Sequence, residues 1–394
     1  MDYKITLQNI TSAASVEIMM RNFSPGKNIK VKKINAFAID NSASILMALA
    51  EADKQNPFGH FGLEVNYIED GMQRNNKMVL KVKPHGDTMV NLVNSLSVAC
   101  GEKLNNVYEA YKSLTGFQQT HQREQEIYTK LQPAIAPVIY GTMLNEKENV
   151  YAILMEYLED VVLLNSTMQP ALWTDKYIRI MLSQLAEWHA STLNKNNLVD
   201  KTFFNNSPTL DLMVQLMPAL HALMENAAHY FPALYTVENV AAGKQIINAI
   251  PHYWQRLENL PKALVHNDCN PRNACFKNTG NGQTLCLYDW ELATFHIPQY
   301  DVAELLCFVL DEDRYHLRRE YVEYYRQALH ALTGKYTDKE MFYADFILAA
   351  NDFGILRVGL YMMAHKVSPY PFMERVVKSF FDTVRNQPTH MEVR

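Results

Sequence analysis

The segment LVHNDCNPRNACF at residues 264–276 sets three polar side chains at offsets of zero, two and seven inside an otherwise apolar frame, namely His266, Asp268 and Asn273. It lies in a β-rich island at 262–290, between blocks at 208–260 and 300–385 whose pattern is mainly helical. Within the island, ACFK and TLCLYDW are predicted strands around the turn NTGNGQ. Such a hairpin brings the end of one strand beside the loop that precedes the other. We therefore expect the three residues to lie near Asp289.

These residue types are the ones that phosphoryl transfer requires. The reaction needs a carboxylate that accepts a hydroxyl proton, and an amide oxygen with a second carboxylate that hold magnesium. Hard oxygen ligands suit Mg²⁺, and most of the catalysis comes from placement and charge neutralisation. The set Asp268, Asn273 and Asp289 therefore predicts a phosphotransferase site.

The order of these residues resembles that of a known family. The spacing H-x-D-x-x-x-x-N matches the kinase catalytic loop, and Asp289-Trp290-Glu291 takes the place of D-F-G. In this respect the chain resembles the aminoglycoside phosphotransferase and choline kinase superfamily, and its helical C-terminal half is similar in character to the CHK or ecdysteroid-kinase-like branch. The upstream lysine strand and the later Y-D-V-A-E at 300–304 support the resemblance.

The resemblance implies an α+β, bilobal, protein-kinase-like fold. Its parts would be a small antiparallel β-sheet N-lobe over residues 1–158 and a larger, mainly helical C-lobe over 159–394 that contributes the catalytic loop and the acceptor pocket. The implied activity moves the γ-phosphate of ATP or GTP, with Mg²⁺ as cofactor, to a hydroxyl of an aminoglycoside-, choline- or natural-product-like acceptor. No G-x-x-x-x-G-K-S/T occurs, which excludes a Walker-type NTPase at the motif level.

The resemblance also assigns roles within the catalytic loop. Asp268 would be the catalytic base, Asn273 and Asp289 the metal ligands, and His266 a scaffold that orients the loop. The family usually has Gly after the His, where this chain has Asn267.

Three neighbouring charges carry further expectations. Asp301 would brace the loop from below. Glu291 would either assist at the metal or face the substrate, and Arg272 would either reach the transferred phosphate or, as we favour, form a surface salt bridge.

The nucleotide phosphates are expected to contact a lysine on the third strand. In MVLKVKP we choose Lys81, although Lys83 has the same strand parity and faces the same side. Its helix partner would be Glu124 in the family pattern R-E-x-x-x-Y, with Glu126 as the alternative.

The hinge and the phosphate-covering turn complete the implied nucleotide site. Met155 would sit beside the adenine pocket, with backbone groups of Glu156 and Leu158 bonded to the base. The turn DNSASI lacks glycine, so Ser42 and Ser44 would donate hydrogen bonds to the phosphates instead. This departure supports an alternative function, a catalytically silent nucleotide-binding pseudokinase or partner-binding protein.

Hydrophobic pattern and turn residues also predict the secondary structure. Three β-rich segments are expected within 29–83, with a loop at 53–63, then a helix over 100–131 and strands at 136–144 and 150–158. A core helix should follow from Thr174, its N-cap, to Leu193, with His189 as a packing residue.

Bulk composition excludes other classes. The 37 basic and 42 acidic residues give a formal charge of −5 without a basic stripe, so nucleic acid is not an expected partner. No export signal or run of ~18 apolar residues is evident, which predicts a cytoplasmic protein without membrane association, and the five cysteines are expected to be reduced and mostly buried. Only about ten residues separate Asp289 from Tyr300, too few for a phosphorylatable activation loop, which disfavours a protein kinase.

Overall fold

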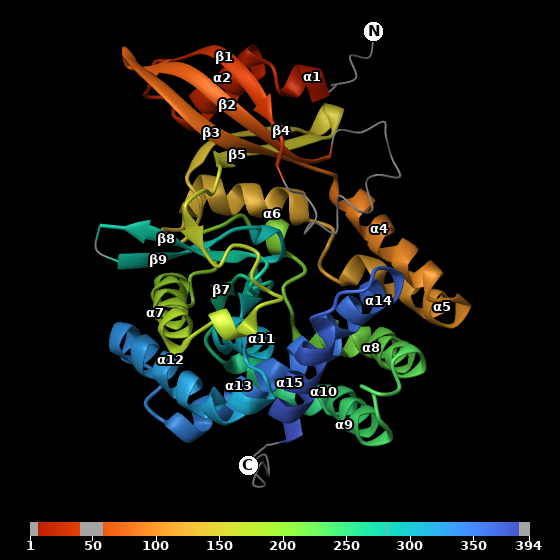
Figure 1. Cartoon of the computed structure of the whole chain (residues 1–394). Coiled ribbons are helices and arrows are strands. Elements are labelled where there is room, and N and C mark those ends of the chain that lie inside the picture. Colours follow the sequence, from red (N-terminus) through yellow and green to blue (C-terminus); the bar gives the residue numbers. More distant parts are fainter. Residues whose placement is uncertain (1–6, 40–57, 281, 386–394) are drawn as a thin grey trace.

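The computed structural model describes residues 7–39, 58–280 and 282–385. Within these ranges an antiparallel sheet of strand order β1-β2-β3-β5-β4 lies above a larger helical part (Figure 1). The predicted α+β bilobal fold is confirmed. Ser42, Ser44 and the second of the expected β-rich segments, at 44–53, lie outside the described residues.

The elements before residue 157 are α1 (Leu7–Ile10), α2 (Ala13–Phe23), β1 (Ile29–Phe37), β2 (Gly59–Glu69), β3 (Met72–Lys83), α4 (Gly86–Ala99), α5 (Glu102–Tyr111), α6 (Thr120–Glu126), β4 (Ile139–Asn145) and β5 (Val150–Glu156). The later helices are α7 (Asp175–Thr192), α8 (Leu210–Tyr230), α9 (Val237–Asn248), α10 (Ile250–Asn259), α11 (Gln299–Val309), α12 (Arg318–Thr333), α13 (Lys339–Asp352), α14 (Gly359–Val367) and α15 (Met373–Arg385). Short strands among them are β6 (Val161–Val162), β7 (Ala263–Val265), β8 (Ala274–Thr279), β9 (Gly282–Leu287) and β10 (Thr294–His296).

The two faces of β3 have different partners. Leu80 and Val82 join the apolar cluster formed with α2, whereas Lys81 and Lys83 alternate with them and point to the opposite face. Strand alternation thus directs both lysines toward Glu124 of α6.

The loop expected at 53–63 is wrong from Gly59 onward, because β2 begins there and pairs with β3 up to Glu69. Asp70 and Gly71 close this hairpin with positive φ, the conformation that favours an Asp-Gly turn. The glycines that indicate a loop are accommodated in the strand: a Cβ at Gly62 would lie 2.7 Å from Phe37.

The helix expected over 100–131 is interrupted. It divides into α5 and α6 around Gly116, whose φ is +91°, and α6 continues into a π-helical turn at Ile127–Leu131. The preceding helix α4 was not expected.

Helices α4 and α5 pack on the C-terminal helices rather than on the sheet. Leu96 of α4 and Leu104 of α5 share an apolar cluster with Leu223 of α8 and Met363 of α14. Figure 1 shows α4 and α5 beside α8 and α14. The predicted boundary at residue 158 assigns these two helices to the N-lobe, whereas their packing partners lie beyond it.

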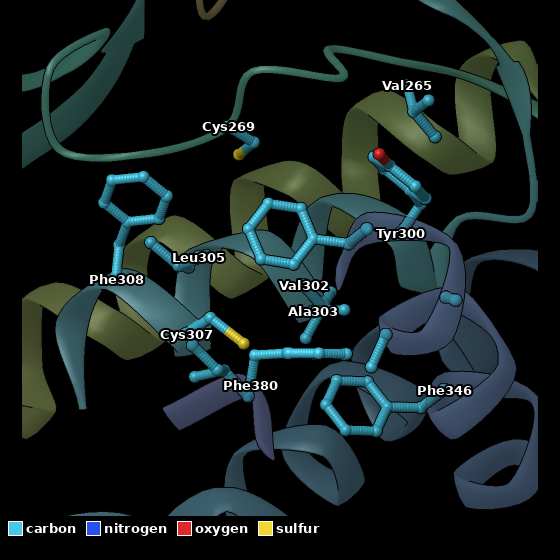
Figure 2. Close-up of a cluster of buried hydrophobic side chains, with 14 of the residues drawn as sticks. Val265, Cys269, Tyr300, Val302, Ala303, Leu305, Cys307, Phe308, Phe346 and Phe380 are labelled. Atoms are coloured by element: carbon cyan, nitrogen blue, oxygen red, sulfur yellow. The ribbon is translucent and has the colours of Figure 1, made fainter. Parts of the chain in front are cut away.

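The core of the helical part surrounds α11. Every residue of α11 is buried, and Figure 2 shows its apolar side chains packed with Phe346 of α13 and Phe380 of α15. Because α11 is buried on all sides, its two carboxylates, Asp301 and Glu304, need partners inside the protein. They lie beneath the catalytic loop and meet that need there.

Two other sequence expectations concern the core. Helix α7 begins after Thr174, as predicted, and all five cysteines are free and buried, also as predicted. Among the described residues, one segment, Lys339–Val367, is long and apolar enough to cross a membrane by length and composition, contrary to the expectation that no such run exists. However, 94% of its most apolar window is buried within the protein, as in a core helix.

Candidate active site

The predicted catalytic loop, residues 266–273, runs between β7 and β8 and is held from below by Asp301. Its Oδ2 accepts from the backbone N–H of His266 at 2.7 Å, and its Oδ1 from that of Asn267 at 2.9 Å. Nε2 of His189 lies 3.0 Å from Oδ2. Burial alone would raise the pKa of Asp301, but these hydrogen bonds hold it below its ordinary value. His189 is thus a hydrogen-bonded core histidine, as expected from its place on α7.

Two residues of the site have a left-handed backbone. The φ of Asn267 is +59° and that of Asp289 is +67°. Asn tolerates this region better than most residues other than Gly, which explains why Asn can stand where the family usually has Gly. The side chain of Asn267 also donates to the carbonyl of Leu292 at 2.7 Å, so it ties the catalytic loop to the segment after Asp289.

Asp268 is enclosed by donors. Its Oδ2 accepts from Nδ2 of Asn273 at 2.6 Å, and its Oδ1 accepts from Arg357 at 3.2 Å and from the hydroxyl of Tyr361. Arg272 lies 3.5 Å from the same oxygen. Burial would raise the pKa of Asp268, but Arg272, Arg357 and Tyr361 hold it below its ordinary value. The carboxylate is therefore ionised at neutral pH.

The favoured interpretation of Arg272 as a surface residue is wrong. Its side chain is only 12% exposed. The guanidinium lies over the ring of Tyr361, 5.1 Å from the centroid, with Phe308 at 5.9 Å and Phe372 at 5.7 Å. These rings cover its faces while its edge points to Asp268.

Sequence reasoning missed Arg357 and Tyr361. Arg357 lies in the π-helical turn Phe353–Val358, and its side chain is 5% exposed. A signal was present, because Arg357 is the only charged residue in FGILRVGLYMMA at 353–364. A charge isolated in an apolar helix requires a buried partner, and here that partner is Asp268.

The lysine strand and α6 meet in a buried ion cluster. Nζ of Lys81 lies 2.8 Å from Oε2 of Glu124 and 2.7 Å from Oδ1 of Asp289. Burial would lower the pKa of Lys81, but these carboxylates raise it well above the ordinary value. Lys81 therefore links α6 to Asp289, which lies two residues after the end of β9. The alternative glutamate, Glu126, is directed elsewhere and accepts from the backbone N–H of Asp200 at 2.9 Å.

Lys83 joins the same cluster on the side away from the ligand cavity. Its Nζ lies 2.5 Å from Oε2 of Glu124 and 2.7 Å from Oε2 of Glu291. Lys81 lines the central cavity, whereas Lys83 is not among the described lining residues. The two lysines share a face, but only Lys81 can meet a ligand there.

Two oxygens of the site suit a magnesium ion. Because Nδ2 of Asn273 donates to Asp268, its amide oxygen is the atom left to face a metal. The backbone bond from Tyr288 N–H to the carbonyl of Asn273, 3.0 Å long, places Asp289 next to this amide. Lys81 engages Oδ1 of Asp289, which leaves Oδ2 as a second hard donor. Oxygens of Glu124, Asp289 and Glu291 also lie within 4.8 Å of one another, although the two lysines already balance much of their charge.

A cavity of about 430 Å³ connects these groups to the end of β5. Met155, Glu156 and Leu158 line it, as do Lys81 and Asp268. The backbone N–H of Glu156 donates to the carbonyl of Val138 at 2.8 Å, so this N–H is not available to a ligand. Within the described ranges, no protein group accepts from the N–H of Leu158.

Glu304 connects the loop to α11 and has an altered titration. It accepts from Cys269 N–H at 3.0 Å and from Asn270 Nδ2 at 3.1 Å. Burial and the charge of Asp268 raise the pKa of Glu304 to about 8.

This shift predicts a loss of stability with rising pH. Above its ordinary pKa of 4.5 the unfolded chain has released the proton of Glu304, whereas the folded chain keeps it up to about pH 8. The free energy of unfolding should therefore fall between these values, by at most about 1.4 kcal/mol per pH unit from this group. Glu304→Gln, which mimics the neutral acid, should flatten this dependence in urea titrations from pH 5 to pH 8. An equal slope in the variant would contradict the assignment.

Comparison with known proteins identifies the family. The model of a phosphotransferase enzyme family matches residues 107–336, which is more than half of the chain. No curated protein matches the chain.

Solved structures are similar at low identity. An ethanolamine kinase of Plasmodium vivax is 13% identical, with 89% of this chain and 82% of that chain covered and a TM-score of 0.49. A GDP complex of an aminoglycoside 2′-phosphotransferase is 12% identical, with 95% and 98% covered and a TM-score of 0.48. A choline/ethanolamine kinase family protein of Mesorhizobium loti is 12% identical, with 88% and 92% covered and a TM-score of 0.42. The assignment depends on the family match: the chain belongs to the phosphotransferase enzyme family.

Proposed function

We propose that this protein is a small-molecule kinase that transfers the γ-phosphate of ATP or GTP to a hydroxyl group. The observation that carries the proposal is that one cavity is lined by the end of β5, Lys81, Asn273, Asp289 and Asp268. These are the groups that phosphoryl transfer needs, arranged from a base-binding edge to a proton acceptor.

At the nucleotide end, the N–H of Leu158 and the carbonyl of Glu156 would bond the base beside Met155. Lys81, oriented by Glu124, would contact the α- and β-phosphates. Asn273 and Asp289 would hold Mg²⁺, which when bound neutralises phosphate charge during transfer. Glu291 is assigned to the charge balance of Lys83, since its Oε2 lies 2.7 Å from that ammonium group.

At the acceptor end, Asp268 would accept the proton of the hydroxyl. Its pKa is held low by Arg272 and Arg357, so it is a weak base that stays ionised. A weak base is sufficient, because little charge develops on the attacking oxygen in a loose transition state and placement supplies most of the catalysis. Asn273, 2.6 Å from the carboxylate, would set its orientation.

The proposed partner is a small molecule rather than a nucleic acid or a membrane, and the proposed compartment is the cytoplasm. Five buried free thiols support a reducing compartment.

The test is Mg²⁺-dependent transfer from radiolabelled ATP and GTP to a panel of amino alcohols, aminoglycosides and hydroxylated natural products. Transfer that Asp289→Asn abolishes, while the variant keeps its circular dichroism spectrum, is the expected result. Nucleotide-dependent thermal stabilisation without transfer to any acceptor would favour the catalytically silent alternative. The absence of both nucleotide binding and transfer would refute the kinase proposal.

A further inference from the structure

The acceptor end of the cavity has an apolar wall made by α4, the segment before α6, and α14. Its described side chains are Met89, Leu92, Val93, Leu96, Phe117, Leu360 and Ala364. Tyr361 lies within this wall, and its hydroxyl donates to Asp268. The wall therefore begins directly beside the proposed base.

The two helices of the wall, α4 and α14, lie side by side in Figure 1. Met89, Val93 and Leu96 recur at helical spacing along α4, and Leu360 and Ala364 share a face of α14. Contact between these apolar side chains and an apolar ligand that displaces water from the cavity is favourable. The wall thus suits the hydrocarbon part of an acceptor.

The charges around the cavity disfavour a cationic acceptor. Each carboxylate among the described lining residues already pairs with a basic side chain: Asp268 with Arg357 and Arg272, Asp289 with Lys81, Glu291 with Lys83 and Glu156 with Lys277. An ammonium group entering beside Asp268 would find no unpaired acid among these and would face two guanidinium groups.

Aromatic recognition of a cation is restricted as well. The ring of Tyr361 is already covered by Arg272, 5.1 Å from its centroid, and by Arg357, at 5.2 Å. A quaternary ammonium group is usually held by several aromatic faces, and of the two rings in the described wall, Tyr361 and Phe117, the one beside Asp268 is occupied.

We infer that the acceptor is a largely hydrocarbon alcohol without a positive charge, whose hydroxyl lies at Asp268 and whose body lies against α4 and α14. This inference rests on the proposed kinase function. It separates this chain from acceptors of the aminoglycoside and choline type.

The test compares naphthyl ethanol with choline and kanamycin. Transfer from ATP is measured for all three, and binding of naphthyl ethanol is measured separately by fluorescence anisotropy. We expect kcat/KM for naphthyl ethanol to exceed that for either cation by at least about 10-fold.

A matched pair of variants on α4 locates the binding. Leu92→Asp puts a carboxylate into the wall, whereas Val98→Asp adds the same charge at a 58% exposed position outside the cavity. Leu92→Asp should weaken naphthyl ethanol binding by at least about 10-fold, and Val98→Asp should leave it within about 2-fold.

The outcomes separate this inference from the kinase proposal. A higher kcat/KM for choline or kanamycin would overturn the inference and leave the kinase proposal intact. Absence of naphthyl ethanol binding, or equal loss in both α4 variants, would also overturn the inference. Binding that only Leu92→Asp weakens, without transfer to any alcohol, would support an apolar-alcohol site and refute the kinase proposal.

Discussion

Asp268→Asn is expected to lower kcat for phosphoryl transfer by about 10²- to 10⁴-fold, the range typical of a positioned proton acceptor. The substitution keeps the size of the side chain but removes the charge that Arg272 and Arg357 neutralise. It also replaces Oδ2, which accepts from Asn273, so the orientation of this amide should be disturbed. The KM for nucleotide should change less than kcat, because the base-binding edge near Leu158 is untouched.

A second aspartate serves as the control. Asp175→Asn removes a 61% exposed carboxylate that pairs with Arg179 on α7, and it should leave kcat within about 2-fold. Thermal unfolding of each variant shows whether lost activity reflects lost structure. An Asp268→Asn protein that is folded, binds nucleotide and turns over at the original rate would exclude Asp268 as the proton acceptor.

Lys83→Met is expected to lower the free energy of unfolding by about 3–5 kcal/mol. Lys83 is 1% exposed and lies 2.5 Å from Glu124 and 2.7 Å from Glu291. Its removal leaves Glu124, Asp289 and Glu291 together with Lys81 as the cation of the described cluster. Two buried carboxylates and the partly exposed Asp289 beside one ammonium group are poorly compensated, so urea unfolding should show a large loss.

The pH dependence of this loss has a definite sign. Burial and the charge of Asp289 already raise the pKa of Glu291, and Lys83 opposes that rise. Without Lys83 the pKa of Glu291 should rise further, so protonation relieves the repulsion as the pH falls. The variant should therefore be destabilised less at pH 5 than at pH 8.

Two further variants test the cause. Lys77→Met removes a 48% exposed lysine of the same strand, paired with the exposed Glu159, and should cost less than about 1 kcal/mol. The double variant Lys83→Met/Glu291→Gln should recover part of the stability lost in Lys83→Met, because it also removes a carboxylate. Equal losses for Lys77→Met and Lys83→Met, or no recovery in the double variant, would contradict the ion-cluster explanation.

Local pattern was sufficient for several elements and for the grouping of the site. Alternation predicted β1 and β3, apolar spacing predicted α7, and the turn NTGNGQ predicted the β8–β9 hairpin. The spacing of Asp268 and Asn273 before that hairpin was enough to expect both beside Asp289, and the structure brings them together. These features depend on residues close in sequence, whose geometry is set by strand and turn periodicity.

Features that depend on contacts between residues far apart in the chain could not be predicted from local pattern. Gly59 and Gly62 indicate a loop locally, but pairing with β3 and packing against Phe37 make them part of β2. The local sequence around Arg272 is typical of a surface charge, but in the folded protein the rings of Tyr361, Phe308 and Phe372 cover its guanidinium group.

The amino-acid sequence alone determined the chemistry of the loop, since residue type and spacing specify which donors and acceptors arrive together. Only the tertiary structure decided which of Lys81 and Lys83 lines the cavity. Strand parity is identical for both, but Lys81 lies at the cavity, whereas Lys83 lies deeper in the ion cluster beside Glu124. The tertiary structure also decided which side chains surround Asp268, the proposed proton acceptor. Arg357 and the wall on α4 come from segments far from Asp268 in the chain, and their meeting depends on how α14 packs against α4 and α8.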